Sequence, residues 1–265
     1  MDPFVQFKDM QRQSWAYFAP LEMHTTPPAA RLVRHARVAR GHRVLDVGCG
    51  TGVVAITAAR AGATVSALDL TPQLLERARE NERIAGVEVE WREGDAEQLP
   101  YADAAFDTVL SQYGHMFAPR PEVAVSEMLR VLKPGGTIAF STWPPELFIG
   151  RTFKMVAQYS PPPPAGVAPP PLWGDPNIVR ERLGNAVKDL VFDRDRMTVP
   201  ALSVAHYRTF FERTAGPVLK LVETLSASDP ARLTEFRREF EVLISEYFRD
   251  NLIHQDYLLT RATKV

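Results

Sequence analysis

Cysteine is almost absent from this 265-residue chain, which contains a single thiol, Cys49. One cysteine excludes an internal disulfide and any zinc site built from several thiolates. Cys49 lies between two glycines, where a small side chain is needed, and we interpret it as a packing residue. We therefore expect no metal in this protein.

Long hydrophobic runs and an excess of one charge are also missing. No apolar stretch approaches the ~20 residues that cross a bilayer, and the segment Met1–Phe4 resembles no secretory leader. The 31 basic and 32 acidic residues nearly cancel, which removes the electrostatic reason to bind nucleic acid or an anionic membrane. These absences predict a cytoplasmic protein that binds neither nucleic acid nor membrane.

The most informative segment is a strand, a glycine turn and a helix in succession. Arg43–Val47 is typical of a buried parallel strand, and Val53–Arg60 is typical of a helix. Between them, Gly48, Gly50 and Gly52 allow a sharp turn and let a ligand approach the main chain. Because the free amides of the helix point at this turn, the segment predicts a nucleotide-type cofactor site.

The glycine spacing distinguishes between cofactors. Dinucleotide-binding folds use G-x-G-x-x-G. This chain instead has Asp46-x-Gly48-x-Gly50-x-Gly52, with the last glycine one residue too early and an acid in front. An NAD-dependent oxidoreductase is therefore only an alternative.

Alternating strand and helix patterns continue along the chain, as expected of an α/β fold. Further strands are predicted at Thr64–Leu68, Val87–Trp91, Phe106–Ser111, Thr137–Thr142, Val187–Thr198 and Leu252–Thr263. Asp69 ends the second strand and Asp95 follows the third. Carboxylates at such strand ends can accept hydrogen bonds from the ribose hydroxyls and the adenine amino group of an adenosine.

Four segments together carry a family resemblance: LDVGCGTG, ALDL, GDAEQLPYADAAFD and MLRVLKPGG. In their order and distances they resemble the class I S-adenosylmethionine (SAM) dependent methyltransferases. Within that class the chain is similar to the type 11 small-molecule enzymes that include the ubiquinone/menaquinone C-methyltransferases. The resemblance covers residues 25–143 and is weaker on both sides.

The resemblance implies an α/β, Rossmann-like, seven-stranded and mostly parallel sheet with helices on both faces. It also implies SAM as the cofactor and S-adenosylhomocysteine as the product, with Asp69 bidentate to the ribose and Asp95 and Ala96 at the adenine. Carried over position by position, the cofactor residues are Asp46, Gly48, Gly50, Gly52, Asp69, Leu70, Asp95, Ala96 and Ser111. Enzymes that methylate base amines carry an Asn/Asp-Pro-Pro-aromatic run after the fourth strand, and this chain has Ser111-Gln112-Tyr113-Gly114 there.

Four regions are expected. Residues 1–40 contain N-terminal helices, at 4–18 and at Pro27–Val38 with Thr26 as its cap, which serve as a lid or merely pack on the domain. Residues 41–200 form the SAM-binding core, with a proline-rich strap at 160–171. Residues 201–250 form a helical insertion that either caps the site or contacts a second copy, and 251–265 form the last strand. Monomer and homodimer both stay open.

Aromatic side chains gather outside the cofactor motifs and predict a small, apolar or aromatic acceptor. The expected acceptor-binding residues are Tyr17, Phe18, Tyr113, Met116 and Phe117. His115, in the loop after the fourth strand, is the candidate general base, with a purely structural role as the alternative. Neither the acceptor nor the atom methylated can be deduced. A non-catalytic SAM-binding or regulatory protein is the second alternative function.

Overall fold

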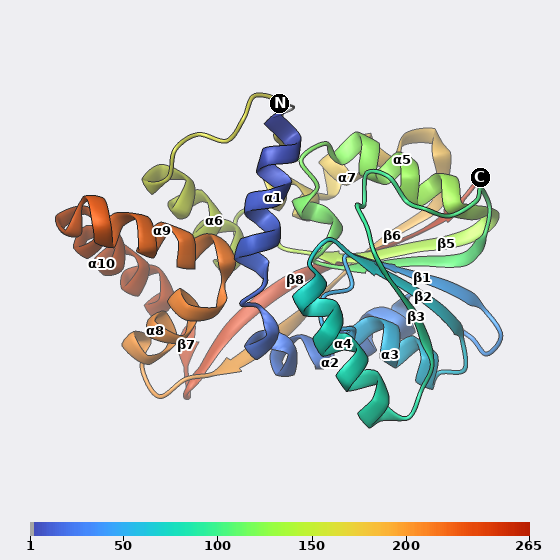
Figure 1. Ribbon diagram of the computed structural model, residues 1–265, viewed down its shortest axis with the longest axis horizontal. Coiled ribbons are helices and arrows are strands. Elements are labelled where there is room, and N and C mark those ends of the chain that lie inside the picture. Colours follow the sequence, from blue (N-terminus) through green and yellow to red (C-terminus); the bar gives the residue numbers. More distant parts are fainter. Residues whose placement is uncertain (1–2) are drawn as a thin grey trace.

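A single mixed β-sheet organises residues 3–265, the part of the chain that the computed structural model describes (Figure 1). The strands follow the order β3-β2-β1-β4-β5-β8-β6, and the two-residue β7 pairs with β8 beside this path. Their bounds are β1 Arg43–Val47, β2 Thr64–Asp69, β3 Val89–Glu93, β4 Phe106–Gln112, β5 Leu132–Thr142, β6 Val187–Pro200, β7 Phe248–Arg249 and β8 Leu252–Lys264.

Strands β1 to β5 run parallel to one another, and β8 runs antiparallel to both of its neighbours, β5 and β6. Val44, Leu45 and Val47 of β1 are fully buried, because helices cover both faces of the sheet. The predicted Rossmann-like fold, with an antiparallel last strand, is confirmed.

Helices form the outer layers and a separate group beside the sheet. The α-helices are α1 Pro3–Trp15, α2 Glu22–His35, α3 Val53–Arg60, α4 Pro72–Ala85, α5 Pro121–Val131, α6 Phe148–Tyr159, α7 Pro176–Leu183, α8 Val204–Thr214, α9 Gly216–Ser228 and α10 Pro230–Tyr247. In Figure 1, α2, α3 and α4 lie on one side of the sheet, and α5 and α7 lie on the other. Helix α1 passes between the sheet and the group α6, α8, α9 and α10.

The helical insertion packs on the same continuous apolar core as the sheet. Helix α10 begins at the Asp229 cap, whose side chain accepts a hydrogen bond from the Arg232 amide at 3.0 Å. Its buried stripe includes Phe236 and Phe240, and the Phe240 ring meets Phe211 of α8 at 5.9 Å. Aromatic packing of this kind fixes α8 and α10 as a unit that can wall a cavity.

The proline-rich segment is attached to the sheet at its C-terminal end. It ends in a short 3₁₀ helix, Pro170–Gly174, whose Trp173 is fully buried. The Trp173 carbonyl accepts a hydrogen bond from the Thr142 hydroxyl at the end of β5. A Cβ on Gly174 would lie 2.2 Å from the Trp143 oxygen, so the two chain segments are in close backbone contact.

Some boundaries differ from those expected. Helix α2 starts at Glu22 rather than near Pro27, because the Glu22 carboxylate is held by Arg77 and Asn81 of α4. The Thr26 hydroxyl therefore donates to the Glu22 carbonyl inside the helix and is not a cap. Strand β5 starts at Leu132, five residues before the expected Thr137. Within residues 3–265, no helix is both long and apolar enough to cross a bilayer.

Candidate active site

One cavity opens along the carboxyl ends of β1, β2 and β4, and it has two halves. We define the strand-edge half by the loop residues that continue those strands, and the helical half by residues from the flanking segments. The strand-edge half includes Gly48, Gly50, Asp69, Leu70, Asp95 and Ala96. The helical half includes Phe18, Trp143, Phe153, Met197, Phe211 and Val218.

The three glycines of the first loop have different roles. All have positive φ angles, which L side chains rarely adopt. A Cβ on Gly48 would lie 2.8 Å from the Gly114 Cα, and one on Gly52 would lie 2.5 Å from the Trp91 ring. A Cβ on Gly50 would meet nothing within 4 Å. Gly48 and Gly52 thus permit close packing of the loop, and Gly50 lies open to the cavity.

Asp46 supports the loop from behind and does not line the cavity. It is fully buried, and its Oδ2 accepts a hydrogen bond from the Ala55 amide in the first turn of α3. Burial raises its pKa to about 8, with a smaller contribution from the nearby Asp69 charge. Asp46, predicted to contact the cofactor, is thus in contact with the main chain of α3 and not with the cavity.

Asp69 is fixed at the tip of β2. Its two carboxylate oxygens accept hydrogen bonds from the Gly50 amide and the Thr71 amide, both at 2.8 Å. Burial raises its pKa above the ordinary value, and these amides act in the opposite direction. The carboxylate is thus held between the glycine loop and the start of α4, facing the cavity.

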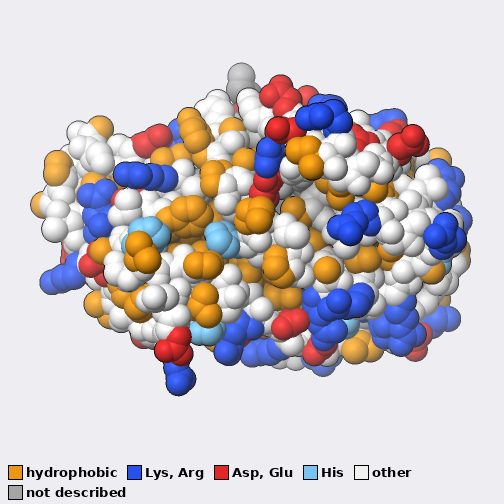
Figure 2. Space-filling view, turned by 90° about the horizontal axis from the view of Figure 1, so that it is seen from below, with side chains coloured by type: hydrophobic (Ala, Val, Ile, Leu, Met, Phe, Trp, Pro, Cys, Tyr) orange, Lys and Arg blue, Asp and Glu red, His pale blue; other side chains and the backbone are white. Residues whose placement is uncertain are grey.

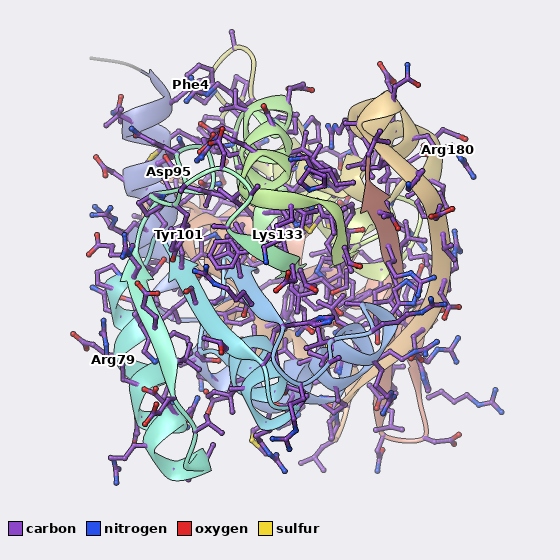
Figure 3. All side chains as sticks on the ribbon, turned by 90° about the vertical axis from the view of Figure 1, so that its right-hand side faces the viewer. Phe4, Arg79, Asp95, Tyr101, Lys133 and Arg180 are labelled. Atoms are coloured by element: carbon purple, nitrogen blue, oxygen red, sulfur yellow. The ribbon has the colours of Figure 1, made fainter. Side chains whose placement is uncertain are left out.

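Asp95 is paired with the N-terminal helix. The Lys8 ammonium lies 2.6 Å from Asp95 Oδ2 and 2.6 Å from Glu97 Oε2, and the Glu97 side chain is completely buried. Figure 3 shows Asp95 beside α1, above the strand ends. The Gln11 amide group also donates to the Phe117 carbonyl at 3.0 Å. Helix α1 therefore contributes to the cavity wall and is fastened to the loops that follow β3 and β4.

The predicted acceptor residues divide into two sets. Phe18, Tyr113 and Phe117 line the cavity. Tyr17 is 51% exposed and points away from it, and Met116 is buried in the core on the far side of its 3₁₀ turn. The two pairs of neighbours, Tyr17 with Phe18 and Met116 with Phe117, thus differ because adjacent side chains in one turn of chain point to different sides, and Tyr17 and Met116 do not line the cavity.

His115 and Ser111 lie beneath the cavity floor. The His115 ring packs against Phe140 and Trp173, with ring centroids 4.6 and 4.7 Å apart, and is 1% exposed. Burial lowers its pKa to about 3. The Ser111 hydroxyl donates to the Val47 carbonyl and accepts from the His115 amide. Neither His115 nor Ser111 is among the residues that line the cavity, and their contacts are with the main chain and with buried rings.

Several polar residues that line the cavity were not expected from the sequence. They are Lys8, Gln11, His24, Gln112 and Gln255. No local motif marks them, since they come from four elements, α1, α2, β4 and β8, and only the tertiary fold brings these together. His24, at the start of α2, lies beside the carboxyl end of β4, because the Gln112 amide donates to the Thr25 carbonyl at 2.8 Å.

The comparisons with known proteins agree with this geometry. A methyltransferase domain matches residues 45–140. An uncharacterised Mycobacterium tuberculosis protein is 37% identical over 257 residues, which are 96% of this chain and 93% of that protein. The malonyl-[acyl-carrier protein] O-methyltransferase of Erwinia pyrifoliae is 42% identical over 112 residues, covering 42% of this chain and 41% of that enzyme.

A solved structure shares the fold across most of the molecule. The YcgJ protein of Bacillus subtilis superposes with a TM-score of 0.61 at 20% identity, covering 89% of this chain and 97% of that one. The glycine loop, the acids at the ends of β2 and β3 and the strand order all fit one assignment. The chain belongs to the class I SAM-dependent methyltransferases, within the type 11 group.

Proposed function

We propose that this protein transfers the methyl group of SAM to a small, apolar or aromatic acceptor bound in the helical half of the cavity. The observation that carries the proposal is the contrast between the two halves of one continuous cavity. One half presents fixed carboxylates and an open glycine, and the other is walled by aromatic and aliphatic side chains.

The strand-edge half fits SAM. Asp69 would accept the ribose hydroxyls, because its oxygens already face the cavity between two backbone amides. Asp95 would accept the adenine amino group, and the Ala96 amide would face the ring. A Cβ on Gly50 would meet no atom within 4 Å, so this glycine borders open space. The methionine part of SAM can therefore approach the main chain there.

When bound, SAM supplies a methyl group already activated by its sulfonium, so no metal is needed. The chain's residues then have to hold the acceptor in line and exclude water. Trp15 of α1 and Phe117 pack with ring centroids 4.6 Å apart, and Tyr113 stacks on Trp143 at 4.0 Å. These rings close the cavity around an apolar acceptor, with α1 as a lid. The proposed partner is a small molecule rather than nucleic acid or a membrane.

The test is a pair of measurements on the purified protein. Calorimetry should show binding of SAM and S-adenosylhomocysteine and no binding of NAD. A panel of aromatic alcohols, amines, thiols and carbon acids should then release S-adenosylhomocysteine in the presence of at least one acceptor. SAM binding without turnover on any member would favour the non-catalytic alternative.

A further inference from the structure

His24 lies at the junction between the two halves of the cavity. On one side, the bond from Gln112 to the Thr25 carbonyl ties the first turn of α2 to the end of β4. On the other side, the His24 ring meets the Phe210 ring of α8 edge-on, with centroids 5.8 Å apart. The next residue, Phe211, lines the helical half. His24 is therefore placed between the cofactor wall and the acceptor wall.

The imidazole of His24 is in the state that a base requires. Burial lowers its pKa from 6.5, which leaves the ring neutral at pH 7, and no charged group adds to this shift. None of the described residues forms a hydrogen bond with its ring nitrogens. The other titratable groups of the described cavity wall are Lys8, Asp69, Asp95 and Tyr113.

Among the described residues, those that line the helical half offer no charged group to a charged acceptor. The only cation among the described lining residues is Lys8, and its ammonium is taken by Asp95 and Glu97. The lining carboxylates, Asp69 and Asp95, belong to the strand-edge half. In the view from below, hydrophobic side chains gather in the left and central parts of the surface with histidines among them, and Lys and Arg lie at the left edge and on the right (Figure 2).

The polar groups that do face this half suit a neutral acceptor. Gln255 is 2% exposed and lines the cavity, and its amide nitrogen donates to the Tyr207 hydroxyl at 2.7 Å. That bond fixes the side chain, so its carbonyl oxygen is the atom left to accept a hydrogen bond from a ligand. A neutral molecule with a hydroxyl or a similar donor matches this wall better than an anion or an ammonium.

On the basis of the proposed methyltransferase function, we propose that the acceptor is a neutral phenol or enol and that His24 removes its proton. The O–H bond breaks and its proton moves to a ring nitrogen of His24, which becomes an imidazolium. An oxygen electron pair forms the new C–O bond to the methyl carbon as the C–S bond breaks. That bond's electron pair stays on sulfur, giving the neutral thioether of S-adenosylhomocysteine, and the imidazolium returns its proton to water.

The weak basicity of His24 sets the class of hydroxyl. Removal of a proton costs less free energy the closer the acidity of the donor is to that of the protonated base. An alkanol hydroxyl is a much weaker acid than a phenol or an enol, so a neutral imidazole removes its proton at a greater cost. Phenols and enols are acidic enough, and their rings or conjugated chains also match the apolar wall.

The test compares His24→Gln with His35→Gln on the same helix. Burial lowers the pKa of both histidines, but only His24 lines the cavity, so His35 is a matched control. The acceptors are 2-naphthol, 2-naphthylamine and 2-naphthalenethiol, which share one skeleton, with 4-alkylphenols and 1,3-diketones beside them. We expect His24→Gln to lower kcat/KM on the hydroxyl acceptors roughly 10²- to 10⁴-fold, with SAM affinity unchanged. His35→Gln should leave both unchanged.

Two further readouts separate a base from a merely structural residue. The wild-type kcat/KM should fall at pH values below the pKa of His24, and this acidic limb should vanish in His24→Gln. The loss should also shrink for nitro-substituted naphthols, which are already ionised. Equal rates for the variant and wild type, or methyl transfer to the amine or thiol alone, would overturn this proposal and leave the methyltransferase function standing. Turnover of no acceptor, despite SAM binding, would mean that the proposed function itself fails.

Discussion

The two halves of the cavity are built in different ways. The strand-edge half comes from loops that each follow a strand, and its key groups are fixed by backbone amides, as Asp69 is by Gly50 and Thr71. The helical half comes from segments far apart in the chain, such as Trp143, Phe211 and Gln255, held by side-chain packing. Rigid backbone suits a cofactor that never changes, and side-chain packing allows the acceptor pocket to vary. The following variants probe this difference.

The largest effect is expected from Gly48→Ala. Its Cβ would lie 2.8 Å from the Gly114 Cα at a φ of +67°, so the glycine loop would have to move away from the end of β4. Strained positions of this kind cost of the order of 1–3 kcal/mol each, and we expect SAM affinity to fall roughly 100-fold or more. Calorimetry measures the affinity, and circular dichroism checks the fold.

Gly86→Ala is the control for Gly48→Ala. Gly86 has a φ of +65° at the end of α4, but nothing lies within 4 Å of its Cβ position. SAM affinity should be unchanged and only the Tm slightly lower. Equal binding by the two alanine variants would show that the contact with Gly114 does not shape the cofactor half.

Asp69→Ala should have the next largest effect. The carboxylate offers charge-assisted hydrogen bonds worth about 1.5–3 kcal/mol each, so SAM and S-adenosylhomocysteine should both bind roughly 10- to 100-fold more weakly. Asp69→Asn keeps the shape and one acceptor oxygen, so its loss should be smaller. If titration calorimetry gives wild-type affinity for Asp69→Ala, Asp69 is not a ribose ligand.

Lys8→Met tests the ion pairs that attach α1 to the loop after β3. The ammonium of Lys8 bridges Asp95 and Glu97, so its loss should loosen α1 and speed the release of S-adenosylhomocysteine by roughly 3- to 10-fold. Arg12→Met is the control, because Arg12 pairs with Glu93 at the exposed surface of the same helix and such pairs contribute little. Stopped-flow displacement measures both rates. Identical release rates would mean that α1 is not a lid.

Asp46→Asn should change pH dependence and little else. Between 3.8 and about 8 the unfolded aspartate is ionised and the buried one holds its proton, so the folded state binds more protons. Stability therefore falls as pH rises through this window. The asparagine cannot titrate, so the variant's Tm should vary less with pH there. A Tm profile parallel to the wild type, from scanning calorimetry across the window, would contradict the raised pKa.

The strand-edge half could be predicted from the sequence because its chemistry is local. Gly50 and Asp69 each belong to a short pattern that combines a strand, a turn and a helix start. The same patterns do not show whether a side chain points into the cavity or inward to the main chain. Asp46 and Ser111 therefore looked like ligands, although both turn inward to bind the main chain.

The helical half could not be predicted because its residues meet only in the folded chain. No motif marks α6, since Pro144 and Pro145 precede it and the proline-rich segment follows. His115 looked like the base because it follows β4, but Trp173, brought there by that segment, covers it. The sequence places His24 between two N-terminal helices and indicates no role for it, because the second helix was expected to begin at Pro27 and in fact starts at Glu22.

The position of β8 has a consequence for the order in which the molecule can assemble. Strand β6 pairs only with β8, and β5 reaches β6 only through β8, although β5 ends at residue 142 and β8 begins at residue 252. A nascent chain can thus close the parallel part of the sheet early, but β6 has no partner until residues 252–264 have been synthesised. Gln255 belongs to β8, so the acceptor pocket is completed only after β8 has been synthesised. Its contacts join residues far apart in the sequence, and such contacts form slowly.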